Sequence, residues 1–217
     1  PNKPRTAWLR SLFFNENQLC HPSALVRRSA YEQAGLYRSA NAQTDDAEMW
    51  TRLLMIADIH VVQEKLTLHR IFSDQSNESG ERPDRRARMW LEWYLQKKHY
   101  IGMSLADVLA AFPESERWVT PKGANSGYLL AMFAIQIGGC PGTRLFGVEL
   151  LYQLMNNSEE RADIEALHGF TYLDFIALTG QEDFFNPAAI APVAPRQIPS
   201  NPLRRFAGKV LRKLHVL

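Results

Sequence analysis

The chain has 217 residues, of which 46% are hydrophobic, 11% aromatic and 22% charged. This balance excludes an intrinsically disordered chain, a collagen-like chain and a coiled-coil rod. With 25 basic and 23 acidic residues, the net charge of +2 is too small to indicate nucleic-acid binding. No segment reaches the run of about 18 uncharged apolar residues that indicates a membrane-spanning helix.

Two cysteines, Cys20 and Cys140, are too few for a disulfide framework or a zinc site. Free cysteine packs as a small apolar residue, so we expect both to be buried thiols. No apolar run follows the positive charges at the start of the chain, as it would in a secretory signal. These features together indicate the reducing cytoplasm.

The first 80 residues mix strand and helix patterns. Runs rich in β-branched and aliphatic residues predict strands, and a run that ends at Gly35 predicts a turn or two of helix. The clearest element is a helix with Thr44 as its N-cap and an apolar stripe that includes Trp50. In chain order we expect a strand at 23–28, helical turns at 29–34, a helix at 44–57, strands at 59–63 and 65–72, and a polar loop at 73–84.

Residues 81–185 form a predicted helical extension. Pro83 opens its first helix, which carries an aromatic stripe that we expect to face the core. The apolar run at 127–140 is interrupted by Gln136 and ends in glycines, so it indicates a buried helix. The stripe consists of Met89, Trp90, Trp93 and Tyr94, and further helices are expected over 104–112, 126–137, 143–155, 158–168 and 171–178.

The end of the chain combines a predicted linker with a basic amphipathic helix. Residues 186–202 are rich in proline, which favours extended chain. Residues 203–217 alternate apolar and basic side chains at helical spacing, and the chain after Asp183 carries a charge of +6, which leaves −4 on the rest. This helix suits either a membrane surface or docking on the protein's own core. It has no aromatic platform for nucleic acid.

Asp45 and Asp46 stand in the first turn of the helix at 44–57 and are called the acidic motif below. Carboxylates there interact favourably with the helix dipole, which is one sufficient reason for their presence. Adjacent carboxylates on one turn point in different directions and make a poor metal clamp. One of them could instead serve as a general base, because the helix N-terminus favours its ionised form.

The order of the motifs resembles the carboxyl-terminal half of family 2 glycosyltransferases, which are inverting enzymes with a GT-A fold. An N-x-x-x-x-x-S-x-x-[IV]-R-[RK] segment precedes a small helix that ends in glycine. An acidic motif, a helix with Trp and Arg, and a strand pair with an aromatic or His before Arg follow. The resemblance covers about residues 12 to 88. Its positions are Ser23, Val26, Arg27, Arg28, Gly35, Asp45, Asp46, Trp50, Arg52, His69, Arg70 and Ser76.

The resemblance implies that Asp46 is the general base, which removes a proton from the acceptor hydroxyl during attack on a nucleotide sugar. Arg70 is a candidate cation for the donor diphosphate, with a structural ion pair as the alternative. His21 could contact the acceptor or the sugar, with a plain core or surface role as the alternative. We expect Trp50 to pack and Arg52 to pair with Asp45 or Glu48.

The sequence departs from the family pattern in three ways. Phe72 stands where many members have a metal-binding His, although His69 could substitute for it. The acidic motif is Asp-Asp rather than Glu-Asp. The 217 residues contain no Asp-x-Asp, the sequence that holds the metal and the diphosphate in this family. We therefore expect the divalent cation, Mg²⁺ or Mn²⁺, to be bound mainly by residues outside this chain.

The sequence thus predicts an α/β fragment over residues 1–80, the acceptor-side half of a GT-A-like domain, followed by a mainly α-helical region. The expected function is part of an inverting glycosyltransferase that uses a nucleotide sugar and a glycan or lipid-linked acceptor, in bacterial surface glycan synthesis. On its own the chain should be inactive. The expected location is the cytoplasm or the inner face of the membrane. The alternative is a non-catalytic helical interaction module with a membrane-surface or docking tail.

Overall fold

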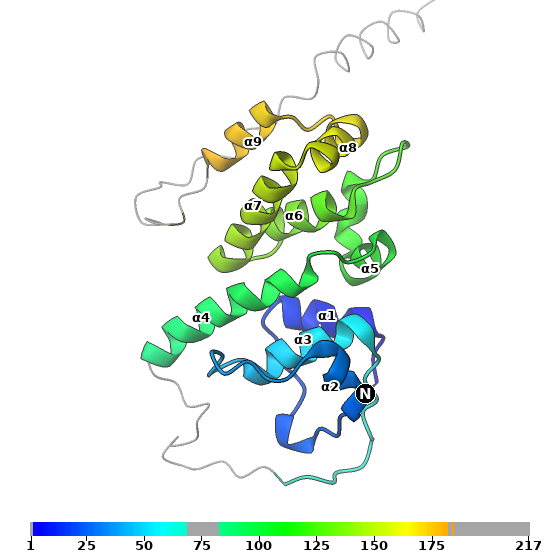
Figure 1. Cartoon of the computed structure of the whole chain (residues 1–217), viewed down its shortest axis with the longest axis vertical. Helices are drawn as coiled ribbons and strands as arrows, with labels where there is room; N and C mark the ends of the chain where they lie inside the picture. Colours follow the sequence, from blue (N-terminus) through cyan, green and yellow to red (C-terminus); the bar gives the residue numbers. More distant parts are fainter. Residues whose placement is uncertain (1, 69–82, 182–183, 185–217) are drawn as a thin grey trace, which may run out of the picture. The chain divides into compact units, whose positions relative to one another are not determined.

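The computed structural model describes residues 2–68, 83–181 and 184, and the regular secondary structure in that part is almost entirely helical (Figure 1). Its chain forms two compact units, residues 1–170 and 171–217. The helices of the first unit are α1 (Arg5–Phe13), α2 (Arg28–Ala34), α3 (Asp45–Ile56), α4 (Pro83–Lys97), α5 (Leu105–Ala111), α6 (Ser126–Gln136), α7 (Pro141–Asn156) and α8 (Ser158–His168), and the second unit contains α9 (Tyr172–Thr179).

The prediction of an α/β portion is wrong, because the described residues contain no sheet. Their β structure is limited to an isolated bridge between Thr120 and Gly123. The segments 24–27 and 59–68 lack strand structure. Val61 exchanges two hydrogen bonds with the Asn2 side-chain amide instead of a neighbouring strand, at 3.1 and 2.6 Å. A strand-like composition shows only that the side chains would suit a sheet. A strand also needs a neighbouring strand to pair with its backbone groups, and composition does not reveal one.

Helix α1 was absent from the sequence prediction, yet it lies at the centre of the core. Four of its side chains are buried, including Phe13, which is fully enclosed. The Phe13 ring lies 5.1 Å from that of Tyr100 and 4.8 Å from that of Phe112, measured between ring centroids. Aromatic pairs at such distances contribute packing energy beyond their buried area. This cluster joins the start of the chain to the helical extension.

The predicted helices from α4 to α9 are confirmed, with shifts of one or two residues at some ends. Helices α6 and α7 pack against each other most extensively and run side by side in Figure 1. Gly147 permits this close approach, since a Cβ at this position would lie 2.7 Å from the Ala131 carbonyl oxygen. The predicted buried helix in 127–140 is α6, whose residues 128–135 are all buried.

Two smaller expectations need correction. Cys20 is exposed and Cys140 is half-buried, so both are free thiols but neither is fully buried. In the aromatic stripe of α4, Trp93 is buried while 45% of the Trp90 surface remains exposed, because only one side of the helix faces the core.

Within the described residues, no helix is long and apolar enough to cross a membrane. The polar loop at 73–82, the linker at 186–202 and the basic helix at 203–217 lie outside them.

Candidate functional site

Helix α3 carries the acidic motif at its first two positions, as the sequence predicts. Thr44 takes the N-cap position, but its side chain does not cap the helix. Its hydroxyl donates instead to Glu92 of α4 at 3.2 Å. The N-terminal end of α3 is therefore fixed by tertiary contacts, and both aspartates of the motif are half-buried.

The Asp46 carboxylate has neutral hydrogen-bond donors. Asn17 Nδ2 donates to Oδ2 at 2.8 Å, and the backbone N–H of Ala47 donates to Oδ1 at 2.7 Å. Burial raises the pKa of Asp46, and the nearby charge of Asp45 adds to the increase. The two hydrogen bonds and His21 act in the opposite direction but do not outweigh the burial. Asp46 has no ion pair within the described part of the chain.

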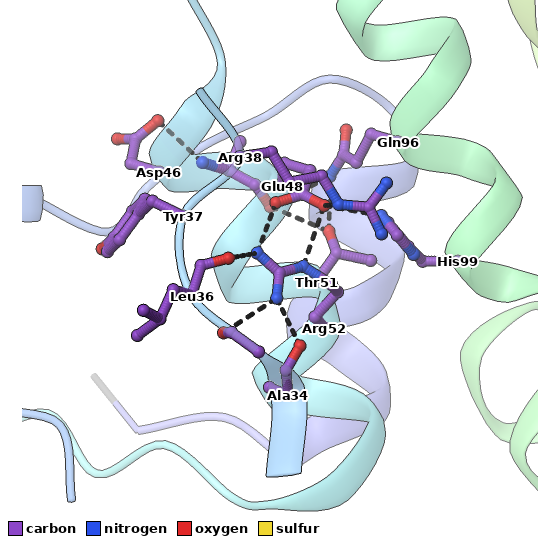
Figure 2. A network of polar contacts seen from close by, with 12 residues as sticks. Ala34, Leu36, Tyr37, Arg38, Asp46, Glu48, Thr51, Arg52, Gln96 and His99 are labelled. Atoms are coloured by element: carbon purple, nitrogen blue, oxygen red, sulfur yellow. Dashed lines mark hydrogen bonds and ion pairs between the residues drawn. The ribbon is translucent and has the colours of Figure 1, made fainter. Parts of the chain in front are cut away.

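Three aromatic rings, those of Tyr37, His21 and Trp50, form a chain of contacts near the acidic motif. The Tyr37 hydroxyl and His21 Nε2 are 2.9 Å apart, and the His21 ring stands nearly perpendicular to that of Trp50 at a centroid distance of 5.9 Å. Burial, Tyr31 and the charges of the acidic motif raise the pKa of Tyr37. Figure 2 shows Tyr37 and Asp46 next to each other. Trp50 is buried, as expected, and His21 is exposed.

Glu48, two residues after Asp46, belongs to a very different group of contacts that we call the Glu48 network. Arg52 donates two hydrogen bonds to its carboxylate, both at 2.8 Å. Arg38 Nε lies 3.0 Å and His99 Nε2 lies 2.7 Å from Glu48 Oε1. Burial alone would raise the pKa of Glu48, but the contacts with His99 and Arg52 hold it at about 2.

Arg52 also fixes the loop that carries Tyr37. Its guanidinium donates to the backbone carbonyls of Ala34, the last residue of α2, and of Gly35 and Leu36, which follow it (Figure 2). Gly35 has a φ of +81°, a conformation that favours glycine. Of the two partners expected for Arg52, the structure shows Glu48. The Trp-x-Arg pattern of α3 thus serves packing and loop geometry.

The structure brings together three of the predicted site residues, Asp46, His21 and Trp50, with Asp45 adjacent to Asp46. His69 and Arg70 lie outside the described residues. The sequence prediction omitted Asn17 and Tyr37. Asn17 stands six positions before Ser23 and is the Asn that opens the family pattern. The pattern therefore contained a sequence signal for this residue. Tyr37 had none, because its role depends on the fold of the loop after α2.

A metal site does not emerge from these residues. The described part of the chain contains no group of three or more His, Cys, Asp or Glu side chains that could hold a metal ion. Asp45 and Asp46 alone supply too few ligands for the Mg²⁺ or Mn²⁺ that the resemblance implies. The residues present therefore do not fit that cation, and we derive no chemical step through it.

Comparisons with models of known protein families, with curated proteins and with solved structures found no match for this chain. The site is therefore interpreted from its own geometry. A half-buried carboxylate that is held by neutral donors and has a raised pKa can accept a proton from a nearby hydroxyl group.

Proposed function

We propose that this chain is part of an inverting glycosyltransferase and that Asp46 is its general base. An acceptor hydroxyl oxygen attacks the anomeric carbon of a nucleotide sugar, and a new C–O bond forms. The hydroxyl proton passes to the Asp46 carboxylate. The bond between the anomeric carbon and the diphosphate oxygen breaks, and the nucleoside diphosphate leaves with the electron pair. The configuration at the anomeric carbon is inverted.

The contrast between Asp46 and Glu48 carries this proposal. A general base works best when its pKa lies near the working pH and its oxygens are within reach of the reacting proton. Burial moves the pKa of Asp46 in that direction, whereas Glu48 is bound by two arginines and a histidine. The proposal therefore rests on side chains of α3 and its neighbouring loops and does not require a sheet in this part of the chain.

The proposed substrates are a nucleotide sugar and a glycan or lipid-linked acceptor, in bacterial surface glycan synthesis. His21 and Asp45 are proposed to contact the substrates, and Trp50 supports them from behind. His69 and Arg70 remain candidates for donor contacts. A reaction at a lipid-linked acceptor would place the protein in the cytoplasm or at the inner face of the membrane. The 217 residues contain no Asp-x-Asp sequence. This supports the proposal that residues outside the chain bind most of the donor and that the chain is inactive on its own.

The test is Asp46→Asn in the product of the complete reading frame, assayed with a panel of UDP-, GDP- and dTDP-sugars and extracted glycan acceptors. Asparagine keeps the shape of aspartate but cannot take up the proton. We expect transfer to fall about 100- to 10,000-fold, the usual contribution of a general base. Donor affinity, measured by titration calorimetry, should change little.

Asp163→Asn is the matched control, because Asp163 lies on α8 and bonds to Asn125 rather than to the proposed site. Its transfer rate should equal that of the wild type. Wild-type turnover in the Asp46 variant would reject Asp46 as the base.

A helical interaction module with a membrane-surface or docking tail is the alternative. The exposed apolar side chains of α4 favour it, since Trp90, Leu91 and Leu95 retain 45%, 56% and 42% of their surface. Sedimentation with phosphatidylglycerol vesicles, with and without residues 203–217, tests the tail. We expect binding only when these residues are present and only at low salt. Equal binding by both forms would remove the lipid role.

A further inference from the structure

One face of α4 directs polar side chains at α3. Glu92 and Gln96 lie on α4, and His99 lies in the 3-10 turn Lys98–Tyr100 that follows it. Their spacings of four and three residues place them on the same side of this helical stretch. Gln96 bonds to Thr51 in the middle of α3, and His99 bonds to Glu48. Glu92 lies nearest to the acidic motif. These contacts link the helical extension to the proposed site along the first two turns of α3.

The Glu92 carboxylate is bound by the loop that leads into α3. Three consecutive backbone N–H groups, those of Ala42, Gln43 and Thr44, donate to it at 2.9, 2.8 and 2.8 Å. The Thr44 hydroxyl adds a fourth hydrogen bond. Glu92 is only 3% exposed, and no cation pairs with it among the described residues. A buried carboxylate is costly unless hydrogen bonds satisfy it, and here the loop backbone supplies them.

We infer that Glu92 is a positioning residue for Asp46, because it fixes the backbone of residues 42–44, which directly precede the acidic motif. Thr44 does not cap α3 with its own side chain. The start of the helix is instead held from α4. The position of Asp46 relative to Asn17 and His21 therefore depends on a residue 46 positions further along the chain. The catalytic meaning of this inference rests on the proposed function, but the positioning itself does not.

The test measures the pKa of Asp46 by NMR of carboxyl-¹³C-labelled aspartate in the intact chain. We compare the wild type with Glu92→Gln and Glu92→Asp. Glutamine loses the charge and one acceptor oxygen. Aspartate keeps the charge but is one methylene too short to reach all three N–H groups. If Glu92 positions Asp46, both variants loosen the loop, expose Asp46 and lower its pKa toward the ordinary aspartate value.

Amide hydrogen exchange provides a second readout. In both Glu92 variants the N–H groups of residues 42–44 should exchange at least about tenfold faster, while the core helices keep their protection. Glu149→Gln is the matched control, since it removes a carboxylate on α7 that bonds to Lys98 and not to this loop. It should leave both the pKa of Asp46 and the exchange of residues 42–44 unchanged.

An unchanged pKa of Asp46 in Glu92→Asp would overturn the inference, because a simple charge effect would appear only in Glu92→Gln. If neither variant folds, Thr44→Val takes their place. It removes only the hydroxyl contact, so a smaller decrease in the pKa of Asp46 supports the inference and no decrease overturns it.

Transfer kinetics separate this inference from the proposed function. In an active enzyme, Glu92→Gln should lower kcat by up to about 100-fold with little change in KM, as expected for a misplaced catalytic group. If Asp46→Asn keeps full turnover while the Glu92 variants still shift the pKa of Asp46, the function is wrong and the positioning stands.

Discussion

Asp46 and Glu48 lie two residues apart on α3, and their carboxylates occupy opposite environments. Asp46 is half-buried and takes its hydrogen bonds from an amide and a backbone N–H. Glu48 is buried and contacts two guanidinium groups and an imidazole. In Figure 2, Asp46 and Tyr37 lie on one side of the view, and His99 and Gln96 lie on the other. Burial raises the pKa of Asp46, while the contacts with His99 and Arg52 hold that of Glu48 at about 2.

This difference separates a structural carboxylate from one that is available for chemistry. Both residues belong to the same acidic first turn, where helix-dipole stabilisation explains either of them equally well. The partners that distinguish them come from the loop after α2, from the loop around Asn17 and from the turn after α4. A cluster of acidic residues in a sequence therefore identifies a candidate site but not its working member.

The largest effect on stability should come from breaking the Glu48 network. Glu48→Gln leaves Arg52 buried without its counter-charge, and removal of one partner of a buried ion pair costs about 3–5 kcal/mol. We expect a decrease of this size in the free energy of unfolding at pH 7, measured by urea denaturation.

Two comparisons sharpen this measurement. Glu32→Gln removes a carboxylate from an exposed ion pair with Arg28 and should cost less than about 1 kcal/mol. The double variant Glu48→Gln with Arg52→Met should lose less than the sum of the single variants, because the contacts are coupled. A loss for Glu48→Gln no larger than that for Glu32→Gln would contradict a structural role for the network.

Local signals explain why most helices could be predicted from the sequence. Ser104 caps α5 by accepting a hydrogen bond from the Asp107 N–H at 3.1 Å, and Gly169 ends α8 with a φ of +61°. Such signals act within a few residues and are visible as sequence patterns. Helix α1 carries no capping side chain and is stabilised by aromatic contacts to residues about 90 to 130 positions away, as for Phe13 with Tyr100 and Phe146.

The strand predictions were wrong because they used side-chain type alone. Leu25 and Leu68 stand in runs with strand-like composition, yet both are fully exposed and neither belongs to a sheet. For the site, the motif order predicted the place of Asp46 and Trp50 on α3. It could not predict Glu92, because this side chain binds backbone N–H groups, which every residue except proline provides. Contacts of this kind leave no pattern in the sequence.

Acid should weaken the Glu48 network selectively. A carboxyl group whose pKa is lowered in the folded state adds stability above its unfolded pKa and loses it as the pH falls through the folded value. For Glu48 that window runs from the ordinary value of 4.5 down to about 2. The stability difference between the wild type and Glu48→Gln should therefore shrink steadily across this window. A difference that stays constant in urea denaturation from pH 6 to pH 2.5 would show that the charge of Glu48 is not the source of its contribution.

Asp46→Asn should give the smallest effect on stability, and its pH dependence should have the opposite sign. The pKa of Asp46 is raised in the folded state, so its ionised form is less favourable there than in the unfolded chain. Ionisation thus costs stability as the pH rises through the unfolded pKa toward the folded one. Asparagine avoids this cost, so the variant should be up to about 0.5 kcal/mol more stable than the wild type at pH 7. The gain should disappear below the ordinary aspartate pKa, where both states are protonated. A clear loss of stability at pH 7 would mean that Asp46, like Glu48, is held in place for structural reasons.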